Sequence, residues 1–118
     1  MSVTIQQEEG NVRVLRITGL LRKAEMDSVF ATEAQEWGPT TRVRVLVMVE
    51  GFEGFERGAN WEDMTFFEKY GDQVDKIAIV VDPRWETDLL MFVGAGFRRG
   101  AVKFFPANQL ALARAWLG

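Results

Sequence analysis

The chain has 118 residues and a mass of 13.4 kDa, the usual length of one domain. Apolar residues make up 47%, enough for a core, whereas the net charge of −3 is opposite in sign to that of most nucleic-acid binders. The chain has no cysteine and no histidine, which excludes disulfides and removes the commonest general base and metal ligand. We therefore expect a single domain over residues 1–118 that lies outside most enzyme classes, with no metal, cofactor or nucleic-acid partner.

The first residues contain neither a basic region nor a long apolar stretch, so they do not look like a secretory signal. The longest apolar run, Leu89 to Phe97 with its two glycines, is shorter than the roughly 20 residues of a membrane span. We expect a cytoplasmic protein with no integral membrane segment.

The chain begins with a predicted hairpin and a helix. Ser2–Gln6 alternates between apolar and polar residues, and Val12–Thr18 is a second strand that Gly19 is expected to end. The short turn between the two strands predicts antiparallel pairing. Apolar residues then recur at helical spacing up to Gly38-Pro39, which predicts one helix with a buried stripe of Met26, Val29, Phe30, Ala34 and Trp37.

Two later runs are apolar on both faces. Val43–Val49 reads VRVLVMV and Ile77–Val81 reads IAIVV, the pattern of central strands in a parallel sheet that is covered on both sides. We expect these strands to lie next to each other, or nearly so, in the middle of the sheet.

Helices are expected around and after these strands. One spans about Asn60 to Tyr70, and a second opens at Asp82-Pro83, where Asp caps and Pro suits the first position, and runs to about Phe97. A short strand at Ala101–Phe105 and a helix starting at Pro106 complete the chain.

The predicted order is β-β-α-β-α-β-α-β-α. The alternation after the hairpin indicates an α/β fold with right-handed crossovers, and the hairpin adds an antiparallel edge, so the sheet is mixed.

The segment from Val43 to Glu86 also carries a family resemblance. An apolar strand is followed by a loop of glycines and aromatics, a helix opening with Trp61-Glu62-Asp63, a second apolar strand, and then Asp82 and Trp85. With the closing stretch Ala113 to Leu117, this pattern resembles the SpoIIAA-like family of the STAS superfamily, whose members are often labelled STAS/SEC14-like. The resemblance covers nearly the whole chain and implies a β-α superhelix with a mixed sheet.

The best-understood relatives implied by this resemblance are anti-anti-sigma factors. They carry a phosphorylatable serine at a helix N-terminus after the third strand, in an Asp-Ser-Ser-Gly-like motif. Here the corresponding residues 50–64 contain no Ser or Thr, and the nearest hydroxyl is Thr65. The nearby acidic residues would repel a phosphate, so we expect no phosphorylation switch at this place.

Candidate binding residues gather around the predicted loop Glu50–Gly58, at the strand end where open α/β sheets bind ligands. Its phenylalanines either fold back onto the core or form an exposed recognition loop. Glu50 and Asp82 close two strands, and such a pair could share a proton or hold a cation. The favoured explanation is that Asp82 caps a helix and Glu50 is a solvated strand end. Trp85 is either a core residue or part of a site, and Arg84 is a plausible anion contact.

Apolar residues surround most of the circumference of the helices near 60–70 and 84–97. Only one face of each helix can pack on the sheet, so the other face is either scattered surface, a dimer interface or a ligand pocket. The candidate ligand- or partner-binding residues are Glu50, Phe52, Phe55, Trp61, Phe66, Asp82, Arg84, Trp85 and Met91, and none is assigned a catalytic or metal-binding role.

We therefore expect a non-enzymatic STAS/SpoIIAA-like binding module that acts through a protein partner or as a homodimer. The alternative is a carrier or sensor of a small apolar, lipid-like ligand. An apolar cavity between the aromatic helices would favour the ligand, and a flat aromatic face would favour the partner. A close, partly buried Glu50–Asp82 pair in a cleft would favour a hydrolase.

Overall fold

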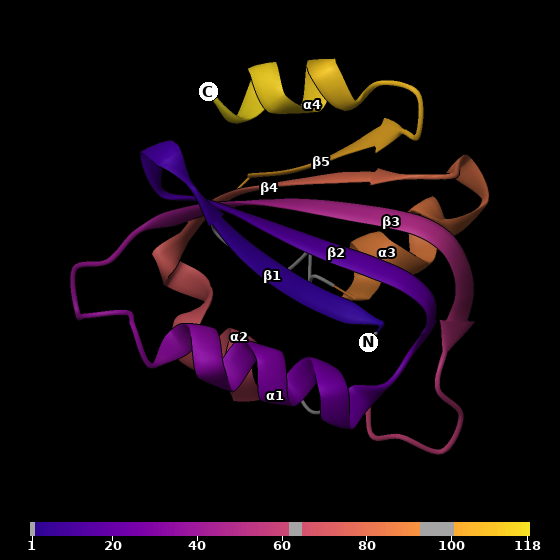
Figure 1. Ribbon diagram of the computed structural model, residues 1–118, viewed down its shortest axis with the longest axis horizontal. Coiled ribbons are helices and arrows are strands. Elements are labelled where there is room, and N and C mark those ends of the chain that lie inside the picture. Colours follow the sequence, from indigo (N-terminus) through magenta and orange to yellow (C-terminus); the bar gives the residue numbers. More distant parts are fainter. Residues whose placement is uncertain (1, 62–64, 93–100) are drawn as a thin grey trace.

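The computed structural model describes residues 2–61, 65–92 and 101–118, with the backbone alone described for residues 65–67. The strands in Figure 1 are β1 (Val3–Glu8), β2 (Val12–Leu21), β3 (Val43–Phe55), β4 (Val74–Val81) and β5 (Ala101–Pro106). The helices are α1 (Lys23–Ala34), α2 (Thr65–Tyr70), α3 (Glu86–Phe92) and α4 (Leu110–Leu117). Short 3-10 turns at Glu9–Asn11, Gly71–Gln73 and Pro83–Trp85 join them.

The five strands form one mixed sheet in the order β1-β2-β3-β4-β5. β1 pairs antiparallel with β2, and every other neighbouring pair is parallel. The predicted α/β class and antiparallel edge are confirmed. The two apolar runs lie in β3 and β4, which pair directly, and neither strand lies at an edge of the sheet.

The strand order explains the layers of the molecule. Each parallel connection steps to the next strand in the same direction, and right-handed crossovers then place all the connecting helices on one face. Figure 1 shows α1, α2 and α3 on this face and α4 on the other. Because β2, β3 and β4 are parallel, the loops that follow them leave the sheet at the same end, where the carboxyl ends of these strands lie.

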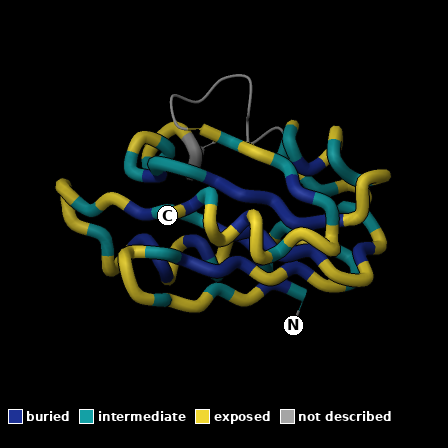
Figure 2. The backbone as a smooth tube through the Cα atoms, turned by 90° about the horizontal axis from the view of Figure 1, so that it is seen from above, coloured by how far each residue is buried: buried dark blue, intermediate teal, exposed yellow. Residues whose placement is uncertain are grey.

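Both faces of the central strands are buried, as their two-sided apolar pattern predicts. Val47 and Ile79 face the layer of α1 and α3 in the larger core cluster, and each is 1% exposed. Leu46 and Ala78 face α4 in the second cluster, and each is 0% exposed. Figure 2 shows these buried residues concentrated along the strands, while the turns and outer helix faces are exposed.

The expected ends of β2 and β3 were wrong, because both strands continue past Thr18 and Val49. Gly19 pairs with Phe52, and Leu21 pairs with Phe55, with register shifts on either side of Gly19. These shifts leave two β3 residues, at positions 51 and 53, without a partner in β2, so the extension is bulged. Gly51 and Gly54 have φ of +56° and +105°, values that glycine adopts without strain.

Two of the expected helices, those near 60–70 and 82–97, are described only in part. α2 begins at Thr65, and the expected residues 62–64 lie outside the described residues. The helix expected from Asp82 begins as a 3-10 turn and continues as α3 to Phe92, and its expected continuation to Phe97 is likewise not described. Asp82 caps it as predicted, because its Oδ1 accepts a hydrogen bond of 3.0 Å from the backbone N–H of Arg84. None of the helices in the described ranges is long and apolar enough to cross a membrane.

A buried ion pair joins β2 to α1 and was not predicted. Arg13 Nε lies 2.8 Å from Glu33 Oε2, and the two side chains are 11% and 5% exposed. The same oxygen accepts a hydrogen bond of 2.8 Å from the indole N–H of Trp37. Glu33 therefore satisfies two donors, the buried Arg13 guanidinium on β2 and the half-buried Trp37 indole after α1.

Replacing Glu33 with alanine should lower the free energy of unfolding by about 3 kcal/mol, because it leaves a buried guanidinium without its carboxylate. Urea denaturation followed by circular dichroism measures the loss. Glu36→Ala is the matched control, since Glu36 is exposed and its carboxylate accepts a hydrogen bond from the side chain of Gln7. Equal losses in the two variants would contradict a stabilising role for the buried pair.

Candidate functional site

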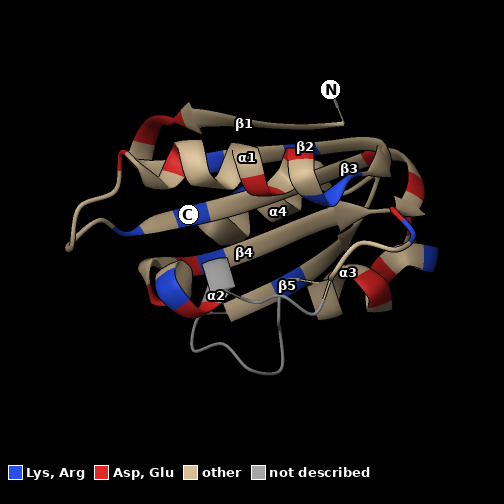
Figure 3. Cartoon of the chain, turned by 90° about the horizontal axis from the view of Figure 1, so that it is seen from below, with Lys and Arg blue, Asp and Glu red and all other residues tan. Residues whose placement is uncertain are grey.

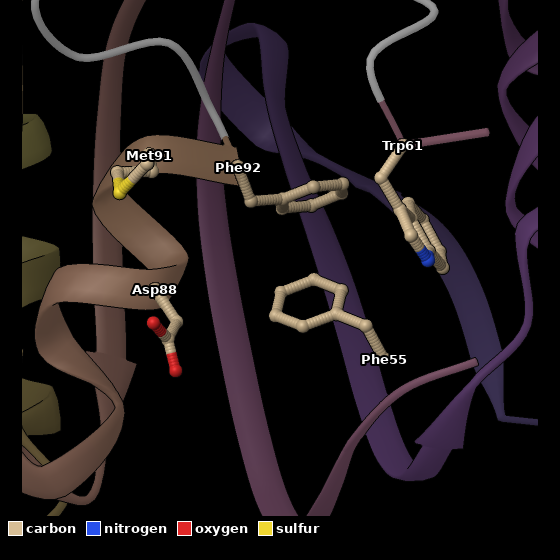
Figure 4. Close-up of a pocket in the computed structure, with 5 residues that line it drawn as sticks. All are labelled: Phe55, Trp61, Asp88, Met91 and Phe92. Carbon is tan, nitrogen blue, oxygen red and sulfur yellow. The ribbon is translucent and has the colours of Figure 1, made fainter. Parts of the chain in front are cut away.

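A cavity of about 390 Å³ opens at the carboxyl ends of the parallel strands (Figure 4). Phe55 comes from the end of β3, Trp61 from the segment that follows, and the remaining lining residues Asp88, Met91 and Phe92 come from α3. Its volume lies within the range of small-molecule sites, about 300–1,000 Å³. The lining is mainly aromatic and aliphatic, with one carboxylate.

The rings that line the cavity contact one another, edge to face in both pairs of Trp61 and tilted in the Phe55–Phe92 pair. The Phe55 centroid lies 5.2 Å from that of Trp61 and 5.7 Å from that of Phe92, and Trp61 lies 6.2 Å from Phe92. Phe52 extends this group of rings toward the core. Its ring centroid lies 5.3 Å from that of Phe55 and 4.8 Å from that of Trp85. Five rings therefore form one continuous group that joins the pocket to the core.

Hydrogen bonds fix one wall of the pocket. The Trp61 indole N–H donates to the Glu56 carbonyl at 2.8 Å, and the backbone N–H of Glu56 donates to the Leu21 carbonyl at 2.9 Å. The carboxylate of Glu56 accepts a hydrogen bond of 3.1 Å from the backbone N–H of Lys23, at the first turn of α1. One residue thus ties the end of β2, the start of α1 and the orientation of Trp61 together.

Asp88 is the charged residue among the described residues that line the cavity. It lines the pocket from α3 (Figure 4), and it is exposed. No lysine or arginine in the described ranges forms an ion pair with it. The first turn of α3 is acidic and contains no basic residue, as the colours in Figure 3 show.

The Glu50–Asp82 pair does not form a buried carboxylate site. Both residues are exposed, and Asp82 is occupied as a cap. Within the described ranges, no three acidic side chains come together in a group that could hold a metal ion. The arrangement that would have favoured a hydrolase is therefore not found.

The other candidates divide between core and pocket. Phe52 is 5% exposed and belongs to the core, and Trp85 is half-buried against it, with the Arg84 guanidinium 5.4 Å from the Trp85 ring centroid. The side chain of Phe66 lies outside the described residues. The structure brings Phe55, Trp61 and Met91 together in the pocket.

A family model matches residues 12–118 of the chain and is described as SpoIIAA-like. The chain belongs to the SpoIIAA-like family. No functionally curated protein matches this SpoIIAA-like chain. A solved structure that it resembles is an uncharacterised protein of the DUF3478 family from Shewanella loihica PV-4, described as having a SpoIIAA-like fold.

The two structures superpose with a TM-score of 0.75 at 18% sequence identity. The match covers 98% of this chain and 92% of the Shewanella protein. At this level of identity the likeness shows the shared fold, and function has to be argued from the side chains of this SpoIIAA-like chain.

The sequence analysis missed Asp88 and Phe92 as pocket residues, although a signal was present. Asp88, Met91 and Phe92 stand at spacings of three and four, which places them on one face of a helix. Met91 was already a candidate, so its neighbours on that face could have been included.

The division between core and pocket predicts different costs of truncation. Phe52→Ala should lower the free energy of unfolding by about 3 kcal/mol because it empties a buried site. Met91→Ala should lower it by less than about 0.5 kcal/mol, because Met91 is 74% exposed. Chemical denaturation of both variants measures the difference. A loss for Met91→Ala as large as that for Phe52→Ala would show that the assignment is wrong.

Proposed function

We propose that residues 1–118 act as one non-enzymatic binding module that holds a small apolar ligand in the aromatic pocket. The observation that carries the proposal is the cavity of about 390 Å³ lined by Phe55, Trp61, Met91 and Phe92. It lies at the edge where open α/β sheets commonly bind ligands. The cavity that was expected to favour the ligand lay between the two aromatic helices, whereas the described lining comes from α3, the end of β3 and Trp61. Its apolar character still supports a ligand over a flat partner surface.

Preorganisation supports the proposal. A ligand gains affinity when the groups that it meets are already held in place, because less conformational freedom is lost on binding. Here the Trp61 indole is held by its hydrogen bond to Glu56, and the Phe55 ring is held by contacts with Phe52 and Phe92. The indole N–H is used within the protein, so the ligand meets mainly apolar ring surface.

The absence of catalysis and of a phosphorylation switch is part of the same proposal. The sequence has no histidine or cysteine, and Glu50 and Asp82 are both exposed rather than paired in a cleft. Residues 50–64 contain no Ser or Thr, and positions 50–55 continue β3 rather than opening a helix. The acidic, cysteine-free composition supports a cytoplasmic location.

A second candidate is a homodimer or a complex with a protein partner. Met91 favours it, because this side chain is 74% exposed on α3, next to the pocket rings. If α3 lies in a twofold interface, sedimentation equilibrium should show a dimer that Met91→Lys converts to monomer. A monomer at high micromolar concentration would exclude the homodimer and leave the ligand proposal in place.

The neutral fluorophore N-phenyl-1-naphthylamine should bind the protein with an increase in fluorescence, because the pocket would shield it from water. Trp61→Ala should weaken binding at least about tenfold, since it removes one aromatic wall. Leu112→Ala is the matched control, because Leu112 is 57% exposed but lies on α4, across the sheet. Absence of saturable binding, or equal weakening by both substitutions, would contradict the proposed function.

A further inference from the structure

Among the described residues that line the aromatic pocket, one is charged, and its surroundings indicate what that group binds. Asp88 lines the pocket from α3, and no described cation pairs with it. The nearest basic residue along the helix is Arg84, one turn earlier, whose guanidinium lies over the Trp85 ring at 5.4 Å instead. The carboxylate is therefore available to a ligand at the mouth of an apolar site.

We propose that the small apolar ligand carries a positively charged alkylammonium group, bound between the Asp88 carboxylate and the rings of Phe55, Trp61 and Phe92. This inference rests on the proposed function and names the chemical class of the ligand. Two independent features of the lining attract the same sign of charge. A carboxylate is an acceptor without donors, and the faces of aromatic rings carry negative electrostatic potential that attracts cations.

The lining also disfavours the other ligand classes. The one strong donor on an aromatic wall, the Trp61 indole N–H, is already bonded to the Glu56 carbonyl at 2.8 Å. None of the described lining residues is a lysine or arginine, so among them a fatty acid or a phosphate ester would meet Asp88 without a compensating positive charge. A neutral hydrocarbon would fill the apolar part but gain nothing from Asp88, whose exposed carboxylate would stay hydrated.

An alkylammonium group suits this combination better than a bare ammonium ion. Its methyl or methylene groups contact the ring faces and Met91, while its charge stays near Asp88. Cations attract aromatic faces within about 6 Å of the ring centroid. The three rings lie within 5.2–6.2 Å of each other, so a single alkylammonium group can approach more than one of them.

Choline and its uncharged carbon analogue 3,3-dimethylbutan-1-ol form a matched pair of probes, since they differ by one nitrogen in place of a carbon. Titration of each probe is followed through the NMR signal of the Trp61 indole N–H, assigned by its loss in Trp61→Phe. We expect choline to bind about tenfold more tightly than the alcohol. Asp88→Asn should remove this preference while leaving the alcohol affinity within about twofold.

Glu86→Gln is the control, because Glu86 lies on the same helix turn but does not line the cavity. An equal loss of choline preference in Glu86→Gln and Asp88→Asn would overturn the inference, since it would indicate a general field of negative charge. Equal affinities for the two probes, or no choline binding while N-phenyl-1-naphthylamine still binds, would overturn the cation inference and leave the apolar site intact. Failure of the fluorophore itself to bind would instead remove the proposed function.

Vesicles of phosphatidylcholine distinguish the source of the alkylammonium group. Cosedimentation that Asp88→Asn abolishes would identify a lipid headgroup. Choline binding without cosedimentation would identify a free small molecule. Either result supports the proposed chemistry, and cosedimentation that is unchanged by Asp88→Asn together with no choline preference would contradict it.

Discussion

The pairing between the end of β2 and the extended end of β3 determines the geometry of the candidate site. Without the bulges, side chains would alternate and Phe52 would face the opposite side of the sheet from Val49. The register shifts near Gly19 change this alternation, so that Phe52 and Phe55 both contact the core cluster on the side of α1 and α3. If β3 ended at Val49, Phe52 would not be placed in the core beneath the ring group, and Phe55 would not be placed in the pocket lining.

The rest of the site depends on this extension through short contacts. Glu56 follows directly after β3, and its backbone and side chain hold the end of β2, the first turn of α1 and the Trp61 indole. α3 begins near the same end of the sheet because β4 runs parallel to β3. It also lies on the same face as α1 and α2 (Figure 1). The singly wound sheet therefore brings together residues from β3 and α3 that are more than 30 positions apart in the sequence, counting from Phe55 to Asp88.

The sequence was most informative where burial on two sides leaves a simple pattern. The VRVLVMV and IAIVV runs predicted paired central strands correctly, because both faces of β3 and β4 are covered. The extension from Glu50 to Phe55 was predicted as a loop, since its glycines and glutamates have low strand propensity and its bulges break the alternation. The Arg13–Glu33 pair was not predicted, because 20 residues separate its partners and a charged residue is usually exposed.

The family resemblance extended the prediction further than periodicity did, but mainly for the fold. It indicated the mixed sheet and directed attention to the segment after the third strand, where the pocket lies. It did not indicate the chemistry of this pocket, because the residues that line it differ in kind from the serine motif of the anti-anti-sigma factors. Only the structure shows that Asp88 and the three rings line one cavity. The preference of this lining for a cationic ligand could be inferred only from that arrangement.

Amide hydrogen exchange of Glu56, measured by NMR in the free protein, tests most directly whether the β3 extension preforms the site. Its N–H donates to the Leu21 carbonyl at 2.9 Å, so we predict exchange nearly as slow as that of the Val47 amide inside β3. The amide of Gly58, in the exposed turn that follows, is the internal reference for an unprotected position. Exchange of Glu56 as fast as that of Gly58 would show that the extension is open in solution and would contradict a preformed pocket.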